Sequence, residues 1–431
     1  MAPKRRVIFD TDPGVDDMLA MLLALAASPE EVELVMISVT YGNVPLKSCL
    51  KNVVTMFHVL NKEMEWRKSN GKPGGFEAFK AYKPVVALGA EHALEEEILR
   101  EDGFHGVDGL HGVHEAHPHL TPEETWKSLF EDGVPTPQED PSYYNHFTPS
   151  KIPAHREMLR ILREEPEDTI TICAVGPMTN LALAAAEDTE TFLRAKEVCV
   201  MGGAVEVPGN ITPFAEFNTY ADAIATARIF ALTSATPAST MPVVPQVIAN
   251  LPPYPENLPK RLRLTLFPLD LTTPHLLKRG LFNDAVAPYV KGGSPMAVWI
   301  NHILGSVFRQ IESRNPHLPE PALPLHDPLV VWYLITYSDP AWKLARNAPE
   351  DIRIETSGQW THGMHVLGQR GCQRAPRARC SIGASGDTIF GKNPKSGFHR
   401  MKVESGNGIN RLVQSPGFDK FAPDLMGHLL G

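Results

Sequence analysis

Val-Ile-Phe-Asp-Thr-Asp-Pro-Gly-Val-Asp-Asp, residues 7–17, joins a short apolar run to four carboxylates. The apolar run is typical of a buried strand, and residues 16–27 follow it with the apolar spacing of a helix. A second strand is predicted at 32–39 and a second helix at 46–60. Strands alternating with helices in this way indicate a parallel sheet with helical crossovers.

The same alternation continues along the chain. Further strands are predicted at 85–88, 169–175 and 198–201, and further helices at 152–164, 179–186, 221–232, 296–313 and 328–336. We therefore predict a single α/β domain over residues 1–431, with a mostly parallel, Rossmann-like central sheet and helices on both faces. Three stretches lack periodicity and are predicted to be surface insertions, at about 61–83, 112–150 and 368–397.

Composition narrows the class of protein. The 431 residues include 41 Lys+Arg and 50 Asp+Glu, a formal charge of −9, which argues against general binding to nucleic acid. With 43% hydrophobic residues the chain can bury a sizeable core, yet no apolar stretch approaches the ~20 residues of a membrane span. Five scattered Cys do not make a disulfide framework. We expect a cytoplasmic globular protein without a membrane partner.

The four carboxylates carry the first indication of chemistry. Asp10 and Asp12 stand at the end of the predicted strand and, two residues apart, share a face. A Pro-Gly turn follows, and Asp16 and Asp17 then open the helix, where the helix dipole favours anions. Carboxylates gathered at one point repel each other unless a cation compensates. Hard oxygen ligands favour Ca²⁺ or Mg²⁺ over zinc.

Other interpretations of this cluster fit less well. Asp16 alone could cap the helix, but a cap needs one carboxylate. An EF-hand loop would need Asp or Asn in place of Gly14 and Glu in place of Met21. A haloacid-dehalogenase-type phosphatase also begins with Asp-x-Asp at a strand end, but normally has Thr or Val where Gly14 stands. The favoured interpretation is a metal site.

The chain resembles the inosine–uridine-preferring nucleoside hydrolases, whose hallmark Asp-x-Asp-Pro-Gly-x-Asp-Asp is present at 10–17. Further blocks follow in the family's order, up to about residue 335: Gly42-Asn43, His105–Leu110, Gly176–Asn180, Met201–Gly203, Gly209-Asn210, Ala215–Asn218 and His326–Pro328. Several of these blocks directly follow predicted strands. In open α/β sheets ligands bind at that edge, so the blocks are expected to converge on one crevice.

This resemblance implies a set of metal ligands. Ca²⁺ would be held by four carboxylates and one backbone carbonyl: Asp12, Asp16, Asp17, Asp327 and the carbonyl of Val175. The ion would also bind the ribose 2′- and 3′-hydroxyls and the attacking water. Asp12 matches the family's general base, and Asp10 would support the ligands without itself touching the ion.

Substrate contacts are implied in the same way. Those to the ribose would come from Asn43, Asn210, Glu216, Asn218 and the main chain of Met201. Cleavage of an N-glycosidic bond builds positive charge on the ribose, which carboxylate and amide oxygens stabilise. His326 corresponds to a general acid or a nucleobase contact, and His105 to a position near the nucleobase pocket.

The expected activity is Ca²⁺-dependent hydrolysis of ribonucleosides of the inosine/uridine type to ribose and free base, for salvage, by a homodimer or homotetramer. Two alternatives stay open, a Mg²⁺-dependent phosphohydrolase using the same acidic cluster and a catalytically silent metal-binding protein. His111, His114, His117 and His119 have the spacing of no regular face, so we predict a solvated loop there instead of a transition-metal site.

Overall fold

The computed structural model describes residues 4–94, 103–131, 145–242, 251–368 and 406–431. Its central sheet has nine strands in the order β10 (Lys343–Leu344), β13 (Ile409–Gln414), β7 (Leu264–Phe267), β6 (Glu197–Met201), β5 (Ile170–Ala174), β1 (Arg5–Thr11), β2 (Val32–Val39), β3 (Val85–Leu88) and β4 (Thr148–Ser150). Neighbouring strands run parallel except β10 and β13, which are antiparallel. The predicted mostly parallel sheet is confirmed.

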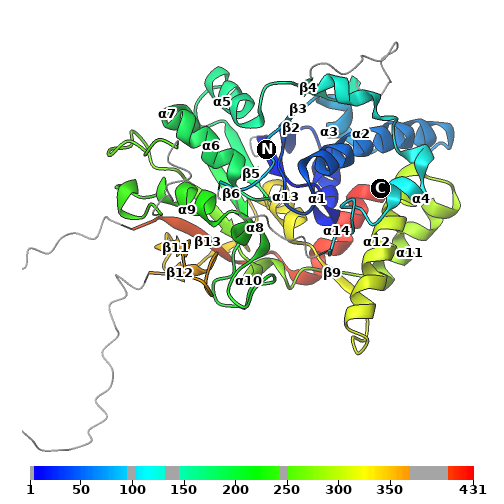
Figure 1. Ribbon diagram of the computed structural model, residues 1–431. Coiled ribbons are helices and arrows are strands. Elements are labelled where there is room, and N and C mark those ends of the chain that lie inside the picture. The colour runs from blue at the N-terminus through cyan, green and yellow to red at the C-terminus, as the bar shows by residue number, and fades with distance from the viewer. Residues whose placement is uncertain (1–3, 95–102, 132–144, 243–250, 369–405) are drawn as a thin grey trace, which may run out of the picture.

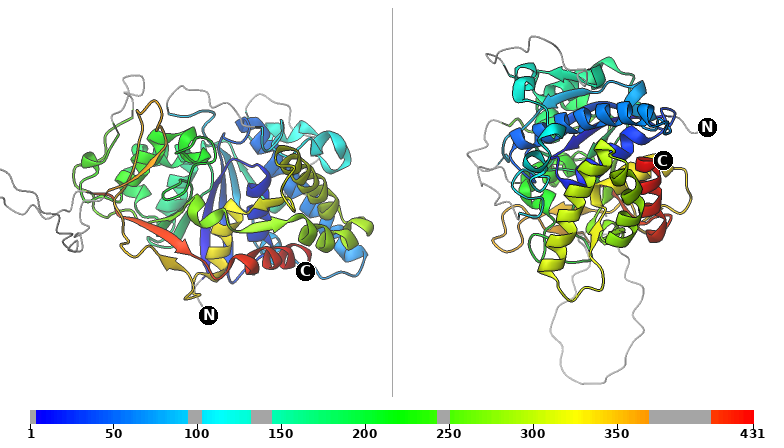
Figure 2. Two further views of the ribbon diagram at one scale, coloured as in Figure 1. Left: turned by 90° about the horizontal axis from the view of Figure 1, so that it is seen from below. Right: turned by 90° about the vertical axis from the view of Figure 1, so that its right-hand side faces the viewer.

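Helices cover both faces of this sheet (Figures 1 and 2). One face carries α1 (Val15–Ala26), α2 (Leu46–Ser69), α11 (Arg279–Lys291), α12 (Pro295–Arg314), α13 (His326–Thr336) and α14 (Phe418–Leu430). The other carries α5 (Ala154–Glu164), α6 (Thr179–Glu187), α7 (Thr189–Phe192) and α9 (Ala223–Ala231). Successive side chains of β1 point to opposite faces of the sheet. Val7 and Phe9 lie in the core on the first face, and Ile8 lies in the core on the second.

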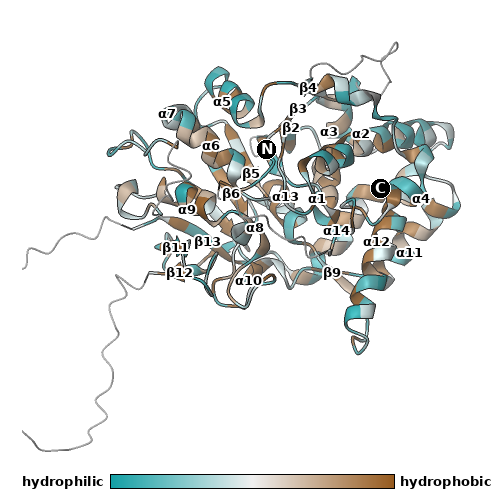
Figure 3. Cartoon of the chain, in the orientation of Figure 1, coloured by the Kyte–Doolittle hydropathy of each residue, from teal (hydrophilic) through white to brown (hydrophobic). Residues whose placement is uncertain are grey.

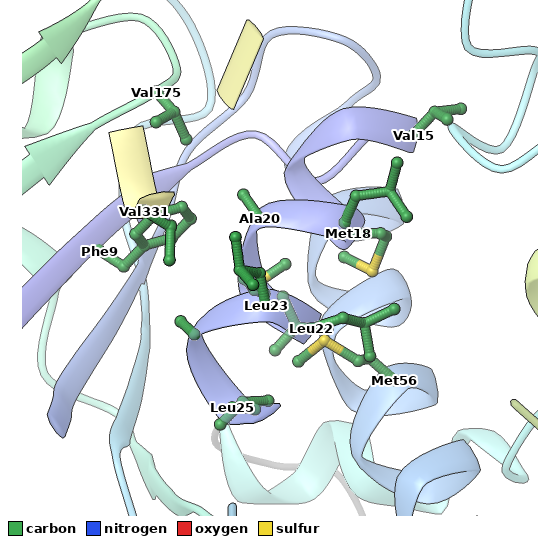
Figure 4. Close-up of a cluster of buried hydrophobic side chains, with 14 of the residues drawn as sticks. Phe9, Val15, Met18, Ala20, Leu22, Leu23, Leu25, Met56, Val175 and Val331 are labelled. Atoms are coloured by element: carbon green, nitrogen blue, oxygen red, sulfur yellow. The ribbon is translucent and has the colours of Figure 1, made fainter. Parts of the chain in front are cut away.

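Helix α1 is buried along almost its whole length, and its ribbon is mostly apolar in Figure 3. Its side chains pack against Phe9 of β1, Met56 of α2 and Val331 of α13 (Figure 4). A helix that is apolar all round belongs inside a protein. Consequently the carboxylates at the start of α1 are also buried, at the carboxyl edge of β1.

The predicted insertion at 61–83 is wrong at its beginning. Helix α2 continues to Ser69, and a short helix α3 (Glu77–Ala81) follows. The charged residues that obscured the helix form a buried ion pair, with Arg67 Nε 2.8 Å from Glu63 Oε1. Arg67 also donates to the carbonyl of Leu429 at 2.8 Å, which ties α2 to the end of the chain.

The segment at 112–150 is also more than a surface loop. Its described part forms α4 (Val113–Ala116), the 3₁₀ turns η1 (Pro118–Leu120) and η2 (Glu124–Leu129), and β4 at the edge of the sheet. Leu120, Trp126 and Phe147 are buried in the core. The third predicted insertion, at 368–397, lies outside the described residues apart from Gly368.

Short elements complete the described chain: α8 (Phe217–Ala221), η4 (Pro237–Ser239), α10 (Leu269–Thr272), the pair β8 (Leu276–Lys278) and β9 (Ala322–Pro324), and the pair β11 (Ile352–Ile354) and β12 (His365–Leu367). In the described ranges no helix combines the length and the apolar character that crossing a bilayer requires.

Candidate active site

Residues 12–17, which form the turn after β1 and the first residues of α1, are called the metal loop below. Asp12 is fully buried in it, and its Oδ2 accepts the backbone N–H of Asn43 at 2.8 Å. The Asn43 amide in turn donates to the Asp12 carbonyl at 3.1 Å and to Asp17 Oδ2 at 3.0 Å. Asp12 Oδ1 is buried with no hydrogen-bond partner in the described part of the chain. That orphaned oxygen is the kind of atom a cation would satisfy.

A second helix brings the remaining carboxylate to this loop. Asp327 lies in the first turn of α13, and ligand atoms of Asp16, Asp17 and Asp327 lie within 4.8 Å of one another. Both α1 and α13 therefore direct their N-terminal ends at the same point, which favours negative charge there. The donor set is entirely oxygen, as Ca²⁺ and Mg²⁺ prefer. These residues fit a hard divalent cation.

Burial makes this cluster costly without a cation. Burial has the larger effect on Asp16 and the charge of the neighbouring Asp17 a smaller one, and together they raise the pKa of Asp16 to about 7. Burial, and to a smaller extent the charge of Asp16, raises the pKa of Asp327 well above its usual range. The pKa of Asp12 is likewise held well above its usual range by burial and by Asp17. Carboxylates in this state favour either protons or a bound cation.

The opposite side of the site comes from the ends of β5 and β6. Asn218 donates from Nδ2 to the carbonyl of Val175 at 2.7 Å and to that of Met201 at 3.5 Å. Glu216 caps α8 and accepts the N–H groups of Asn218 and Gly203, both at 2.8 Å. Three of the residues implied as ribose contacts, Glu216, Asn218 and Met201, therefore share one hydrogen-bonded unit, whereas Asn43 is bonded to Asp12 and Asp17 of the metal loop.

Two histidines face the site from separate elements. His105 Nδ1 accepts the backbone N–H of Val15 at 3.0 Å, so the neutral ring carries its proton on Nε2. His326 begins α13, and its Nδ1 lies 2.7 Å from the Thr272 hydroxyl. Burial lowers the pKa of His105 to about 3 and that of His326 to about 4, so both rings are neutral at pH 7.

These groups enclose a cavity of about 280 Å³. Of the residues picked out from the sequence, the following line it: Asp16, Asn43, His105, Val175, Met201, Asn210, Glu216, Asn218, His326 and Asp327. Asp10, Asp12 and Asp17 are not among the lining residues. Asp10 accepts hydrogen bonds from the hydroxyl of Ser38 and, at 2.9 Å, from the amide of Asn180. It is therefore held by these two residues and does not reach the cavity surface.

Sequence reasoning missed part of the cavity wall. The additional lining residues are Phe104, Ile211, Phe217, Arg314, Leu323 and Pro324. Phe217 lies within the quoted block Ala215–Asn218, and Phe104 and Ile211 directly adjoin quoted blocks, so their position in the sequence was an available signal. Arg314 ends α12, far from any block, so no local pattern indicated it.

The histidine-rich segment is only partly solvated. The prediction of a solvated loop is wrong for His114, which is buried and bonds through Nε2 to Asn52 Oδ1 at 2.8 Å. The ring of His117 lies 5.1 Å from that of His302. Over the described ranges, however, one group of three side chains is close enough together to hold a metal ion, and it consists of Asp16, Asp17 and Asp327. None of the histidines belongs to such a group there.

Fold and site together define an α/β protein with a buried cluster of carboxylates, able to hold a hard cation, at the carboxyl edge of a parallel sheet. The particular family follows from comparison with known proteins. A family model described as inosine-uridine preferring nucleoside hydrolase matches residues 7–389, and the chain belongs to this family. It is thus a hydrolase acting on N-glycosyl bonds, a class that does not include the phosphohydrolase alternative.

Individual curated proteins are similar to this chain over most of its length. An uncharacterised protein of Schizosaccharomyces pombe is 32% identical over 363 residues, 84% of this chain and 88% of that protein. The pyrimidine-specific ribonucleoside hydrolase RihA of Salmonella newport is 26% identical over 361 residues, with 84% and 88% covered.

Solved structures share the fold. A purine-preferring ribonucleoside hydrolase from Gardnerella vaginalis has a TM-score of 0.63 at 18% identity, with 99% of this chain and 98% of that one covered. A plant nucleoside hydrolase has a TM-score of 0.60 at 20% identity, with 100% of both chains covered.

Proposed function

We propose that the chain catalyses the Ca²⁺-dependent hydrolysis of ribonucleosides of the inosine/uridine type to ribose and free base. The observation that carries the proposal is the gathering of buried carboxylates, an amide–carboxylate unit and two neutral histidines around one cavity of about 280 Å³. Hydrolysis of an N-glycosidic bond needs a base for water, a negative environment for the ribose and a donor for the leaving group.

In this proposal Asp12, Asp16, Asp17, Asp327 and the carbonyl of Val175 hold the ion. Ca²⁺ bound there would supply Lewis acidity and a fixed positive charge for the ribose hydroxyls and for water. Asp12 accepts the proton of the attacking water. The Asn43 N–H holds one carboxylate oxygen of Asp12, and the orphaned Oδ1 is left for these contacts.

The ribose is bound on the other side by Asn43, Asn210, Glu216, Asn218 and the Met201 main chain. Glu216 is fixed by three backbone N–H groups, those of Gly203, Asn218 and Thr219. Its orientation is therefore set before substrate arrives, so no reorganisation is needed as positive charge develops on the sugar.

The nucleobase occupies the end of the cavity near His326 and His105. Each ring has Nδ1 engaged, His105 by the Val15 N–H and His326 by the Thr272 hydroxyl. In the tautomer of His326 whose Nδ1 accepts from Thr272, as that of His105 accepts from Val15, Nε2 carries the proton and can donate to the departing base. Phe104 and Phe217 line the same cavity and provide apolar walls for a planar ring.

The function is tested by ribose release from a panel of purine and pyrimidine nucleosides, in Ca²⁺ and after chelation. Chelator-sensitive ribose release supports the proposal, and the panel defines the base preference. Absence of ribose from every nucleoside, in protein that still binds Ca²⁺, contradicts it. A cytoplasmic homodimer or homotetramer is part of the proposal, and sedimentation analysis tests the assembly.

We expect 2′-deoxyribonucleosides to be poor substrates. Loss of the 2′-hydroxyl removes one proposed ligand of the ion and leaves buried polar groups unpaired, so kcat/KM should fall by about a hundredfold for deoxyuridine against uridine. Ribose and deoxyribose release measured at equal enzyme concentration check this. Equal turnover of the two substrates contradicts binding of the ion to the 2′-hydroxyl.

Stability should depend on pH in opposite ways with and without Ca²⁺. The pKa of Asp16 is raised to about 7 by burial and Asp17, so ionising it disfavours the folded state. In the chelated protein, protonated Asp16 therefore contributes most to the free energy of unfolding below pH ~4. This contribution decreases as the pH rises and is lost by about pH 7, where the buried carboxyl ionises. Bound Ca²⁺ prefers the ionised carboxylates, adding about 2.7 kcal/mol at a hundredfold excess over Kd.

Thermal unfolding at pH 5 and pH 8 measures this effect. The gain in Tm from Ca²⁺ should be larger at pH 8 than at pH 5. A gain that is equal at the two pH values contradicts the raised pKa values of the cluster.

A further inference from the structure

The metal loop is held by a side chain that belongs to none of the sequence blocks. Asn52 lies on α2 and is fully buried. Its Nδ2 donates to the carbonyl of Pro13 in the metal loop at 2.8 Å. The same nitrogen donates to the carbonyl of Asp108 at 2.9 Å. One amide group thus bridges two segments that are about 95 positions apart in the chain.

The second segment, residues 103–112, is called the His105 loop. It is folded on itself, because Asp108 Oδ1 accepts the N–H groups of Leu110 and Gly112, both at 2.9 Å. It also contacts the metal loop directly, through the Val15 N–H donated to His105 Nδ1. Asn52 and His105 therefore form two separate cross-links between the same pair of loops.

Close approach at this bridge depends on a glycine. Gly109 has φ +85°, and a Cβ there would lie 2.7 Å from Asn52 Nδ2 and 3.2 Å from the Pro13 carbonyl. A side chain at 109 would displace either the amide or the metal loop. The backbone of the His105 loop is thus shaped around Asn52.

His114 fixes the orientation of the Asn52 amide. Because Nδ2 faces two carbonyls, Oδ1 must accept, and it lies 2.8 Å from His114 Nε2. His114 Nε2 therefore carries the proton, and His114 Nδ1 accepts from the Thr121 hydroxyl at 3.1 Å. Both N–H groups and the oxygen of Asn52 are engaged, so a flipped amide would lose every one of these bonds.

We propose that Asn52, oriented by His114, is a positioning residue that couples the metal loop to the His105 loop. It touches neither the proposed ion nor the substrate. It sets the backbone between Asp12 and Asp16, and hence the separation of their carboxylates, together with the placement of His105. The cation side and the nucleobase side of the site are then organised as one unit. The effect on catalysis rests on the proposed function, and the coupling of the loops does not.

Asn52→Asp is the decisive variant, because it keeps the shape and replaces the two donors by a carboxylate facing two carbonyls. Asn61→Asp is a matched control on the same helix, since Asn61 also pairs with a histidine, His146, at 3.2 Å but is away from the site. His114→Leu removes the orienting donor, whereas His114→Gln keeps an N–H for Asn52 Oδ1.

Two readouts are needed. Ca²⁺ titration by calorimetry should show Kd raised at least about tenfold in Asn52→Asp and His114→Leu, as expected for residues that support metal ligands, with Asn61→Asp and His114→Gln near wild type. Hydrogen–deuterium exchange of the chelated protein should be about tenfold faster in both residues 12–17 and 103–112 of Asn52→Asp. This second readout requires neither metal nor substrate.

The outcomes separate the two proposals. Faster exchange in both loops, with weaker Ca²⁺ binding, supports the coupling. Exchange in Asn52→Asp that matches Asn61→Asp in both loops overturns it, whatever the hydrolytic activity. If the wild type binds no Ca²⁺, the proposed metal function fails, while the exchange comparison still decides the coupling. If Asn52→Asp does not fold, His114→Leu against His114→Gln gives the same comparison with a smaller perturbation.

Discussion

Asp12→Asn is expected to lower kcat for ribose release by at least about a thousandfold, because it removes both the proposed base and one oxygen ligand of the ion. The amide can still accept the Asn43 N–H at the position of Oδ2. The other position then presents an NH₂ group in place of the orphaned Oδ1. An amide has no useful basicity at neutral pH, so the attacking water keeps its proton.

The stability of Asp12→Asn separates lost chemistry from lost folding. Burial and the charge of Asp17 raise the pKa of Asp12 well above its usual range, so the ionised carboxylate disfavours the chelated fold. Neutralising it should leave Tm in chelator unchanged or higher at pH 8. Asp284→Asn on the exposed side of α11 is the matched control and should keep full activity. An Asp12→Asn enzyme with more than a tenth of wild-type kcat would show that another group accepts the proton.

Much of the architecture could be predicted because local signals and tertiary packing agree. The strand predicted at 32–39 is β2, and the helix predicted at 328–336 lies within α13. Near-continuous apolar runs are what a strand buried on both faces requires. The prediction that sequence blocks after separate strands converge on one crevice is consistent with the cavity, which Asn43, Val175 and Met201 all line.

The incorrect predictions concern polar or charged side chains that are buried because they pair with one another. The end of α2 was missed because Glu63 and Arg67 appear solvated in the sequence, yet they neutralise each other in the interior. His114 appears to belong to a polar loop, yet it is buried against Asn52. The three partners of Asn52, Pro13, Asp108 and His114, all come from other segments, so its role follows from the three-dimensional structure alone.

His326→Ala should lower kcat on uridine and inosine by about 10²–10⁴-fold, because the leaving base would depart without a hydrogen-bond donor. The same variant should hydrolyse 4-nitrophenyl riboside within a few-fold of wild type, since nitrophenolate is stable as an anion. The hydroxyl of Thr272 lies 2.7 Å from His326 Nδ1, and we infer that it donates to this nitrogen, which leaves the proton of the neutral imidazole on Nε2.

Thr272→Val should therefore show the same dependence on the leaving group with a smaller amplitude, and Thr272→Ser should restore activity because the hydroxyl returns. Thr336→Val, at the other end of α13, is the matched control for losing a threonine hydroxyl. A structural defect at the start of α13 would slow both classes of substrate equally, because it would also displace Asp327. Equal losses on nucleosides and on the nitrophenyl substrate would thus assign His326 to holding the metal ligand, and unequal losses assign it to the leaving base.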